Sequence, residues 1–226
     1  MTDKKRRYRM TRRAAMEQQT RRRITEALVA LHERVGPAHT SISLLARHAG
    51  VRRSTVYRHF PDETALLTAC STHWRAAHPP PSIERWAAIA EPDLRLETAL
   101  RELYGYYEDN ERMLTNLLRD EAAMPTLRRL LDGFRGYLAH AQDILARALN
   151  GDSAAERRRV RAAVGHALAF FTWRSLVRDQ GLDGTQAADL MCRLAAAARA
   201  ERASAIPSPR PALRRTPRSS PPPRPT

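Results

Sequence analysis

Cysteine is scarce in this chain of 226 residues, and its two cysteines, Cys70 and Cys192, lie far apart. Two isolated cysteines cannot build the disulfide framework of a small secreted domain. Cys70 and His73 could share a helix face, but no second Cys/His pair accompanies them to complete a zinc site. We therefore expect no metal and no cofactor, and we interpret both cysteines as small buried apolar residues.

Long apolar segments are also missing. No apolar run approaches the roughly 18 residues that a membrane-spanning helix needs. The basic start, MTDKKRRYRMTRR, is not followed by the apolar region of a secretory signal. We expect a cytoplasmic protein with no membrane partner. Apolar residues nowhere alternate with a period of two over a useful length, so strands are not supported either.

Recognisable catalytic motifs are absent. The sequence has no glycine-rich phosphate loop, no nucleophile elbow, no paired metal ligands and no cluster of convergent carboxylates. Its scattered Asp and Glu residues are better interpreted as the solvated faces of helices. Of the classes of function considered, an enzyme ranks last.

Positive charge is plentiful, and it is concentrated at the two ends. The formal net charge is +15, of which residues 1–23 contribute +8 and residues 203–226 contribute +5, leaving only +2 for residues 24–202. Basic ends on a nearly neutral body indicate contact with a polyanion, with nucleic acid ahead of a membrane surface. For the C-terminal end, a solubilising tail is an equally good interpretation.

Helical periodicity dominates the first third of the chain. Apolar residues recur at spacings of three and four, and Gly36 with Pro37 ends the first such segment. Thr40 or Ser41 can cap the next helix, which ends at Gly50, where a left-handed turn costs least. Four helices are predicted here, over residues 21–35, 41–49, 53–60 and 63–77.

The segment HPPPS at residues 78–82 indicates a domain boundary. Five further helices are predicted beyond it, over residues 93–109, 111–123, 126–149, 154–180 and 185–202. The last segment holds eight of the fifteen prolines and almost no apolar residue, so we expect it to be disordered. The predicted parts are a basic, flexible arm (1–19), a helix-turn-helix domain that includes the start of a linking fourth helix (20–78), a helical domain (79–202) and a disordered tail (203–226).

The two short helices joined by Ala-Gly-Val have the sequence form of a helix-turn-helix, whose second helix enters the major groove of DNA. Arginine can bond guanine with two parallel donors, and threonine can reach base edges. The outward positions suited to this contact are Arg52, Arg53, Ser54, Thr55 and Arg58. Tyr57 and His59 can donate to phosphate oxygens. The arginines of a short helix can also simply face solvent. The DNA-binding interpretation is therefore favoured mainly by the neighbouring features: a capped supporting helix, a basic arm upstream and a helical body downstream.

The stretch TSISLLARHAGVRRSTVYRHFPDETALL resembles the DNA-binding signature of the TetR family of transcriptional regulators. The resemblance covers roughly residues 20–70, and FFTWRSLVRDQGL at residues 170–182 is similar, more loosely, to the penultimate helix of many members. It implies an all-α dimer in which three N-terminal helices bind operator DNA and the remaining helices bind a small effector. It also implies that Arg52, Arg53 and Thr55 meet bases. By the same resemblance Tyr57 and His59 meet phosphates, and the supporting helix contacts DNA at Ser43. With the cap residue Ser41, these residues complete the predicted DNA-binding set.

Two positions depart from the family pattern. Arg52 stands where the family often has a capping serine, which leaves the start of the recognition helix uncertain by a residue or two. Glu63 stands where a lysine commonly meets a phosphate, and a carboxylate repels phosphate. We predict that the basic arm, Lys4 to Arg13, supplies the missing affinity by lying along the DNA backbone or a minor groove.

Aromatic and sulfur-containing residues recur at helical spacing beyond the boundary. Core packing is the ordinary role of such residues, but together they can line an apolar cavity between helices. His140 and His166 are interpreted as hydrogen-bonded core histidines or as a polar pocket rim. The residues predicted to line an effector pocket are Trp86, Tyr104, Tyr107, Met113, Phe134, Tyr137, His140, Phe170 and Trp173. Because no charged cluster marks the region, we expect a hydrophobic or aromatic effector.

Small residues crowd the last two predicted helices, where they permit close helix packing. The resemblance implies that this pair forms a four-helix dimer interface with its twin. A dimer suits DNA as well, since two recognition helices about 34 Å apart meet successive major grooves of a palindrome. The leading hypothesis is a ligand-released repressor that binds an operator as a homodimer. The alternative is a sequence-tolerant architectural DNA-binding protein without an effector. The sequence leaves open the operator, the effector, the regulated genes, the choice between repressor and activator, and the role of the tail.

Overall fold

The computed structural model of the protein describes residues 2–149 and 153–200, and within these ranges the chain forms helices and turns but no strand. The predicted all-α architecture is therefore confirmed. In chain order the helices are α1 (Thr2–Arg34), α2 (Ile42–His48), α3 (Arg53–His59), α4 (Glu63–Ala77), α5 (Ile83–Ala87), α6 (Pro92–Asp109), α7 (Glu111–Asp120), α8 (Pro125–Leu149), α9 (Ala154–Leu168), α10 (Phe170–Arg174) and α11 (Gly184–Ala200). A 3₁₀ turn covers Pro37–His39 and a π-helical turn covers Ser175–Asp179. The predicted tail, residues 203–226, lies outside the described residues.

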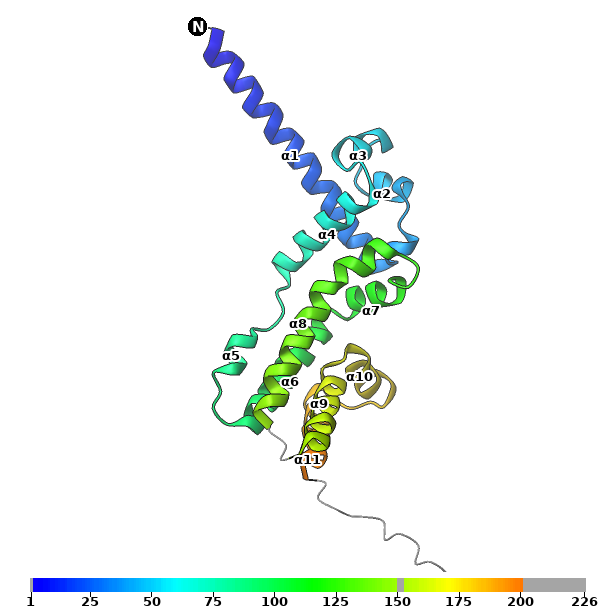
Figure 1. The fold of residues 1–226 in the computed structure, drawn as a ribbon. Coiled ribbons are helices and arrows are strands. Elements are labelled where there is room, and N and C mark those ends of the chain that lie inside the picture. Colours follow the sequence, from blue (N-terminus) through cyan, green and yellow to red (C-terminus); the bar gives the residue numbers. More distant parts are fainter. Residues whose placement is uncertain (1, 150–152, 201–226) are drawn as a thin grey trace, which may run out of the picture.

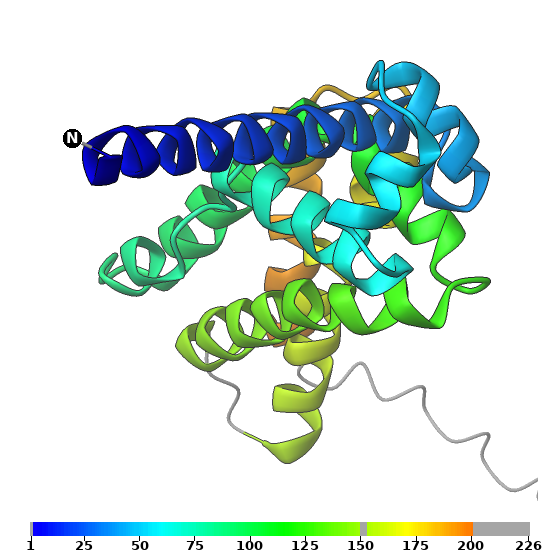
Figure 2. The same ribbon diagram turned by 90° about the horizontal axis from the view of Figure 1, so that it is seen from above.

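The helix-turn-helix lies at one end of the molecule and the last three helices lie at the other. Figure 1 shows α2 and α3 beside α1 at one end and α9, α10 and α11 at the other, with α8 extending between them. Figure 1 also shows the N-terminal turns of α1 projecting beyond the body, and Figure 2, turned by 90°, shows α1 as one long continuous helix. These turns and the α2–α3 pair lie at the same end of the molecule, away from α11.

The first helix differs from the prediction. In place of a flexible arm over residues 1–19, the structure has one continuous helix that begins at Thr2 and includes the helix predicted to start at Arg21. No glycine or proline interrupts residues 2–34, and ion pairs one turn apart support the helix at Arg13–Glu17 (3.3 Å) and Arg22–Glu26 (2.7 Å). Charge density alone therefore does not make this segment a flexible arm, since its residues include good helix formers.

The α2–α3 pair follows the sequence signals closely. The Ser41 hydroxyl accepts a hydrogen bond from the main-chain N–H of Leu44 (3.1 Å), so Ser41 rather than Thr40 caps α2. Gly50 has φ +62°, a left-handed conformation that favours glycine. The pair packs on α1 through the fully buried side chains of Ile24, Leu31, Leu45, Val56 and Phe60.

The fourth helix has the predicted bounds, Glu63–Ala77. Asp62 caps it by accepting a hydrogen bond from the N–H of Ala65 (2.7 Å). Its Cys70 packs in the core of the N-terminal helices, whereas Trp74, one turn later, packs in the core of the body. Helix α4 therefore joins the two cores, and the short α5, which was not predicted, follows the proline segment.

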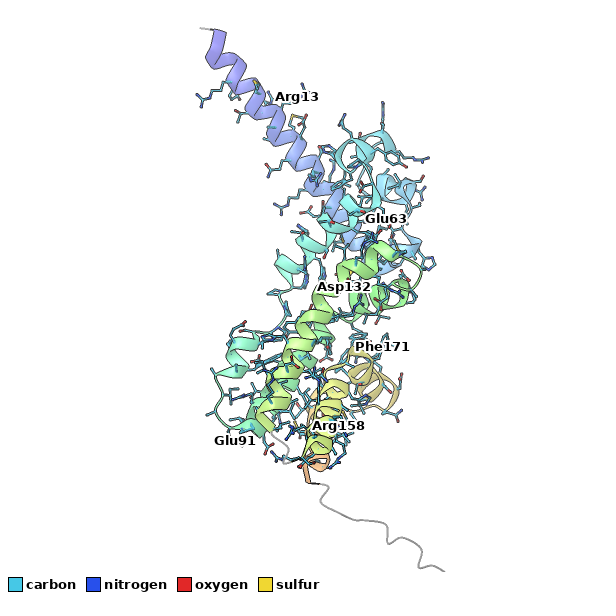
Figure 3. All side chains as sticks on the ribbon, in the orientation of Figure 1. Arg13, Glu63, Glu91, Asp132, Arg158 and Phe171 are labelled. Carbon is cyan, nitrogen blue, oxygen red and sulfur yellow. The ribbon has the colours of Figure 1, made fainter. Side chains whose placement is uncertain are left out.

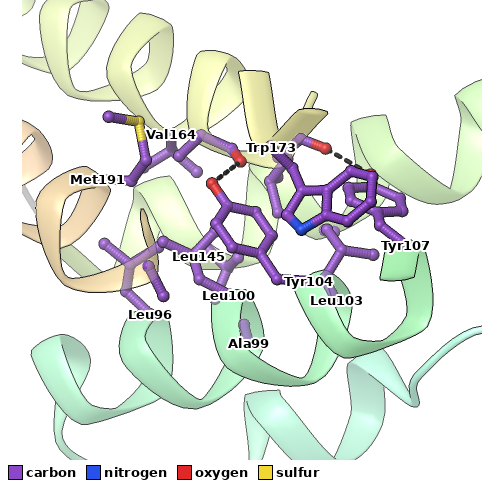
Figure 4. Packing of buried hydrophobic residues seen from close by; sticks show 14 of the residues in the cluster. Leu96, Ala99, Leu100, Leu103, Tyr104, Tyr107, Leu145, Val164, Trp173 and Met191 are labelled. Atoms are coloured by element: carbon purple, nitrogen blue, oxygen red, sulfur yellow. Dashed lines mark hydrogen bonds between the residues drawn. The ribbon is translucent and has the colours of Figure 1, made fainter. Parts of the chain in front are cut away.

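The segment predicted as one helix over residues 154–180 is divided in the structure. Helix α9 ends at Leu168, and Ala169 is extended (φ −73°, ψ 133°) before α10 and the π-helical turn. The Tyr104 hydroxyl donates to the carbonyl of Ala167 (2.9 Å) and the Tyr107 hydroxyl to that of Leu168 (2.6 Å). Figure 4 shows these bonds as dashed lines among the packed core side chains. Since carbonyls at a helix end lack partners within the helix, two tyrosines of α6 stabilise a break that no glycine or proline indicates.

Small residues of α9 and α11 pack these two helices together, whereas larger apolar residues of α11 lie on another face. Ala163 of α9 and Ala187, Ala188 and Ala195 of α11 are buried, and the two helices pack against each other within the chain. Leu190 and Leu194, one turn apart on α11, are instead 44% and 42% exposed. One face of α11 thus belongs to the body, and another presents apolar side chains to solvent.

Candidate nucleic-acid interface and ligand cavity

The outward face of α3 carries the side chains that the sequence analysis assigned to DNA. The side chains of Arg52, Arg53, Ser54, Tyr57 and Arg58 are exposed, with Tyr57 at 48%. Thr55 and His59 are partly buried, and Val56 and Phe60 point into the core. The helix is thus held by two apolar residues and leaves its basic and hydroxyl groups free to approach a groove.

The sequence left the first residue of the recognition helix uncertain, and the structure shows where α3 begins. Arg52 is the N-cap residue, with φ −77° and ψ 152°, and no side chain caps the helix. Arg53 is consequently the first helical residue. On the supporting helix, Ser41 is exposed and already bonded to the Leu44 N–H, while Ser43 is partly buried.

Arg21 of α1 holds the C-terminal end of α3. Its guanidinium donates to the carbonyl of His59 and lies 4.2 Å from the centre of the Phe60 ring. Burial, followed by the nearby charges of Arg58 and Arg21, lowers the pKa of His59. The neutral ring that results still has one N–H donor for a phosphate oxygen.

A basic groove lies between α1 and α3. It has a volume of about 400 Å³ and is lined by Arg12, Arg13, Met16, Glu17, Thr20, Arg58 and His59. Figure 3 labels Arg13 on the projecting part of α1 and Glu63 at the start of α4. Glu63 is exposed, so an acidic residue does occupy the surface at the start of α4.

A separate, mainly apolar cavity of about 240 Å³ lies between α1, α4, α6, α7 and α8. It is lined by His32, Leu67, Cys70, Ser71, Trp74, Arg75, Pro80, Tyr106, Met113, Leu114, Leu117, Leu127, Leu130, Leu131, Gly133, Phe134 and Tyr137. Of the nine residues predicted to line an effector pocket, three do so: Met113, Phe134 and Tyr137. The cavity is close to the lower end of the range for small-molecule sites, about 300–1,000 Å³.

The other six predicted pocket residues lie elsewhere. Trp86, Tyr104, Tyr107, Phe170 and Trp173 are buried in the core of the body, so packing is the role that the structure gives them. His140 is exposed on α8, and His166 is exposed on α9 and bonded to Thr172, so neither is a core histidine. Helical spacing identified apolar faces but could not show which of them enclose a cavity.

His32 is a buried residue of the cavity lining that the sequence pattern did not predict. Its ring Nδ1 lies 3.3 Å from Sγ of Cys70, and its main-chain carbonyl accepts a hydrogen bond from the Asn116 side chain (2.9 Å). Burial lowers the pKa of His32 to about 4 and raises that of the Cys70 thiol to about 12, so both groups are neutral at pH 7. The available signal was a lone histidine one turn after Leu28 on the apolar face of the first helix.

Two further features bear on the described part of the chain. No three metal-ligating side chains gather into a group there. Nor does any helix in that part have the length and apolar character needed to cross a membrane.

Residues 24–70 match the family described as bacterial regulatory proteins, tetR family. No curated protein matches the sequence.

Solved structures extend the likeness over most of the chain, as fold alone. A TetR-like transcriptional regulator from Rhodococcus sp. RHA1 is 18% identical, with a TM-score of 0.57 over 81% of this chain and 97% of that one. A putative TetR-family regulator from Mesorhizobium loti is 18% identical, with a TM-score of 0.54 over 80% and 96%. The regulator FadR from Bacillus subtilis, solved with stearoyl-CoA, is 18% identical, with a TM-score of 0.50 over 79% and 97%.

The chain thus joins a helix-turn-helix of the type found in tetR-family regulatory proteins to an all-helical body. The match to the tetR family is confined to residues 24–70, which hold this helix-turn-helix.

Proposed function

We propose that this protein is a repressor that binds a palindromic operator as a homodimer and is released by a small apolar or aromatic effector. The observation that carries the proposal is the outward face of α3, where three arginines, a serine and a tyrosine are exposed together on a helix anchored by Val56 and Phe60. Such a face fits a major groove, which admits one helix and displays a distinct pattern for each base pair.

Within this proposal the residues divide by role. Arg52, Arg53 and Thr55 meet base edges, because they precede or begin the helix at the end that faces a groove. Ser54 and Arg58 lie on the same outward face, and Tyr57 and His59 donate to phosphates. Ser41 and Ser43 place the supporting helix against the backbone. Residues 20–78 are the DNA-binding domain and residues 79–202 the effector-binding and dimerisation domain.

The helical form of the basic N-terminal segment bears on how it would approach DNA. Because α1 is continuous, this segment meets DNA as a helix that projects past α3 rather than as a flexible arm. Arg12 and Arg13 line the groove beside Arg58, so a phosphate that contacts α3 there also comes close to α1. This contact compensates for the carboxylate of Glu63 at the start of α4.

The cavity between α1, α4, α6, α7 and α8 is the proposed effector site. His32 and Cys70 connect it directly to the core of the DNA-binding helices. A ligand that fits the cavity in only one arrangement of α1 and α4 shifts the population toward that arrangement. The solved FadR structure with stearoyl-CoA supports the view that this fold is compatible with a ligand that has an apolar chain.

Selection of bound fragments from random duplex DNA tests the proposal. We expect one palindromic sequence to be enriched and to bind about 10³-fold or more tightly than random DNA. Arg53→Ala should relax specificity at one base pair by about 1–3 kcal/mol, whereas Tyr57→Phe should weaken binding evenly across sequences. If no sequence is preferred, the chain is a sequence-tolerant DNA-binding protein and the repressor proposal fails.

A further inference from the structure

The lining of the proposed effector cavity has one strongly basic side chain and no acidic one. Arg75, near the end of α4, lines the cavity, and none of its other lining residues is Asp, Glu, Lys or Arg. The only other titratable base is His32, which is neutral at pH 7 because it is buried. The electrostatics of the cavity therefore disfavour a cationic ligand and favour an anionic or neutral one.

Arg75 has no acidic partner among the residues that the structure describes. Its Nε donates to the carbonyl of Ser71 one turn back (3.3 Å), which leaves the terminal nitrogens of the guanidinium available. One of these, Nη1, lies beside Gly133 of α8, which also lines the cavity. The guanidinium consequently sits where α4 and α8 meet.

Arg75 is the one arginine in the cavity lining, and two arginines on the neighbouring helices α7 and α8 are paired with carboxylates. Arg135, two residues beyond Gly133 on α8, pairs with both Glu121 (2.7 Å) and Asp132 (2.9 Å). Arg119 of α7 pairs with Asp120 (2.7 Å). An unpaired guanidinium beside an apolar cavity is suited to a carboxylate, which it can bind with two parallel hydrogen bonds.

The rest of the cavity lining is mainly apolar and indicates that the remainder of the ligand is a hydrocarbon group. Trp74, Tyr106, Phe134 and Tyr137 give aromatic faces, and leucines from α4, α7 and α8 fill most of the remaining surface. Since Arg75 is exposed at the edge of the cavity and His32 is buried at α1, the charged head belongs at the α4–α8 edge and the hydrocarbon part inside.

We propose that the effector is an apolar monocarboxylate whose carboxylate pairs with Arg75 and whose hydrocarbon part fills the cavity. This inference rests on the proposed function, because it names the ligand class of the same site. A ligand bound in this way bridges α4, which continues from the DNA-binding helices, and α8 of the body.

Two matched series of probes test the inference on the full-length protein: 4-phenylbutyrate, its methyl ester and 4-phenylbutylamine, and octanoate, methyl octanoate and octylamine. Within each series the hydrocarbon part is constant and the head is anionic, neutral or cationic. Calorimetry and thermal unfolding are expected to show that at least one carboxylate binds about tenfold or more tightly than its ester and amine. If esters or amines bind as well as the acids, or if neither acid binds at millimolar concentration, the inference is overturned.

Variants locate the binding. Arg75→Gln should weaken carboxylate binding about tenfold and leave ester binding unchanged, and Arg75→Lys should restore part of the loss. Arg112→Gln is the matched control, because Arg112 is exposed on α7 outside the cavity lining. Leu130→Trp, which fills the cavity from α8, should reduce binding of every probe. Equal effects of Arg75→Gln and Arg112→Gln would place the carboxylate elsewhere.

Operator selection and probe binding, measured on the same protein, distinguish failure of the repressor proposal from failure of the proposed ligand class. If the protein selects an operator but binds probes regardless of head charge, the ligand class is wrong and the repressor proposal stands. If it binds the carboxylate but selects no operator, the repressor proposal fails and the ligand class of the cavity stands.

Discussion

The side-chain amide of Asn116 donates hydrogen bonds of 2.9 Å to the carbonyl oxygens of both His32 and Glu33, in the last turn of α1. Two neighbours on α7 continue this contact: Arg119 donates to the carbonyl of Val35 (2.9 Å), and the Asp120 carboxylate accepts from the N–H of Ala38 (3.0 Å). Helix α7 therefore holds the main chain where α1 ends. The ring of His32 lines the cavity at the same place, so the cavity and the DNA-binding helices share this junction.

Asn116→Ala is expected to lower the free energy of unfolding by about 1–3 kcal/mol, because it leaves two main-chain carbonyls in a buried setting without their donor. Urea unfolding measures the change. Gln142→Ala is the matched control, since the Gln142 amide also donates to a main-chain carbonyl, that of Arg161, but at an exposed site. Equal losses for the two variants would show that the junction contributes nothing special.

Ser41→Ala and Ser153→Ala each remove the cap of a helix, α2 and α9 respectively. Both should cost about 1 kcal/mol of stability. Only Ser41→Ala should weaken DNA binding, because α2 supports α3 whereas α9 lies at the other end of the molecule. Parallel urea titrations and DNA titrations check this expectation, and unchanged DNA affinity in Ser41→Ala would contradict it.

Deletion of residues 2–13 should flatten the dependence of DNA affinity on salt. The deleted stretch has seven Lys/Arg residues, and each phosphate contact contributes about 0.9 to the slope of log K against log salt. Truncation of residues 203–226, which removes five arginines, is the comparison for a basic segment with no assigned position on DNA. An unchanged slope after deletion of residues 2–13 would refute the contact by α1.

The low pKa of His32 predicts a loss of stability at mildly acidic pH. In the unfolded chain His32 takes up a proton near pH 6.5, but in the folded chain only near pH 4, so the unfolded state binds more protons between these values. Stability should therefore fall by about 2 kcal/mol from pH 7 to pH 5 through this residue. His32→Leu should reduce the measured fall by that amount, whereas His140→Gln, at an exposed position of α8, should not.

Leu194→Asp is expected to convert the proposed dimer to a monomer. Leu194 and Leu190 are exposed together on α11, and a carboxylate placed within an apolar interface would be buried without a partner. Sedimentation equilibrium measures the association. Leu94→Asp is the control, because Leu94 is 52% exposed on α6 and takes no part in the proposed interface. If both variants remain dimeric, the last two helices do not form the interface.

Local signals predicted the DNA-binding helices well, because the features that define them are local. The caps at Ser41 and Asp62 and the left-handed Gly50 lie within a few residues of the elements that they begin or end. The break at Ala169 was not predictable in this way, since its carbonyl partners are tyrosines some sixty residues earlier in the chain.

The cavity was predicted only in part for a similar reason. Its lining comes from five helices, and an apolar face on one helix does not indicate whether a neighbour fills it or leaves space. Phe134 and Tyr137 were therefore found by composition, whereas His32 and Arg75 required the packing of α1 and α4. The high density of charge in residues 2–19 suggested a flexible arm. The absence of any helix-breaking residue was the better indicator, since the segment is helical.

The continuity of α1 has a geometric consequence. At 1.5 Å per residue, Arg21 lies about 17 Å from His32 along the helix and Arg12 about 30 Å. A tilt of about 5° around the last turn of this helix would move Arg21 by about 1.5 Å and Arg12 by about 2.6 Å. Displacement grows with distance along a rigid helix. A distance or fluorescence probe on the N-terminal turns is therefore the most sensitive to a small movement at the junction.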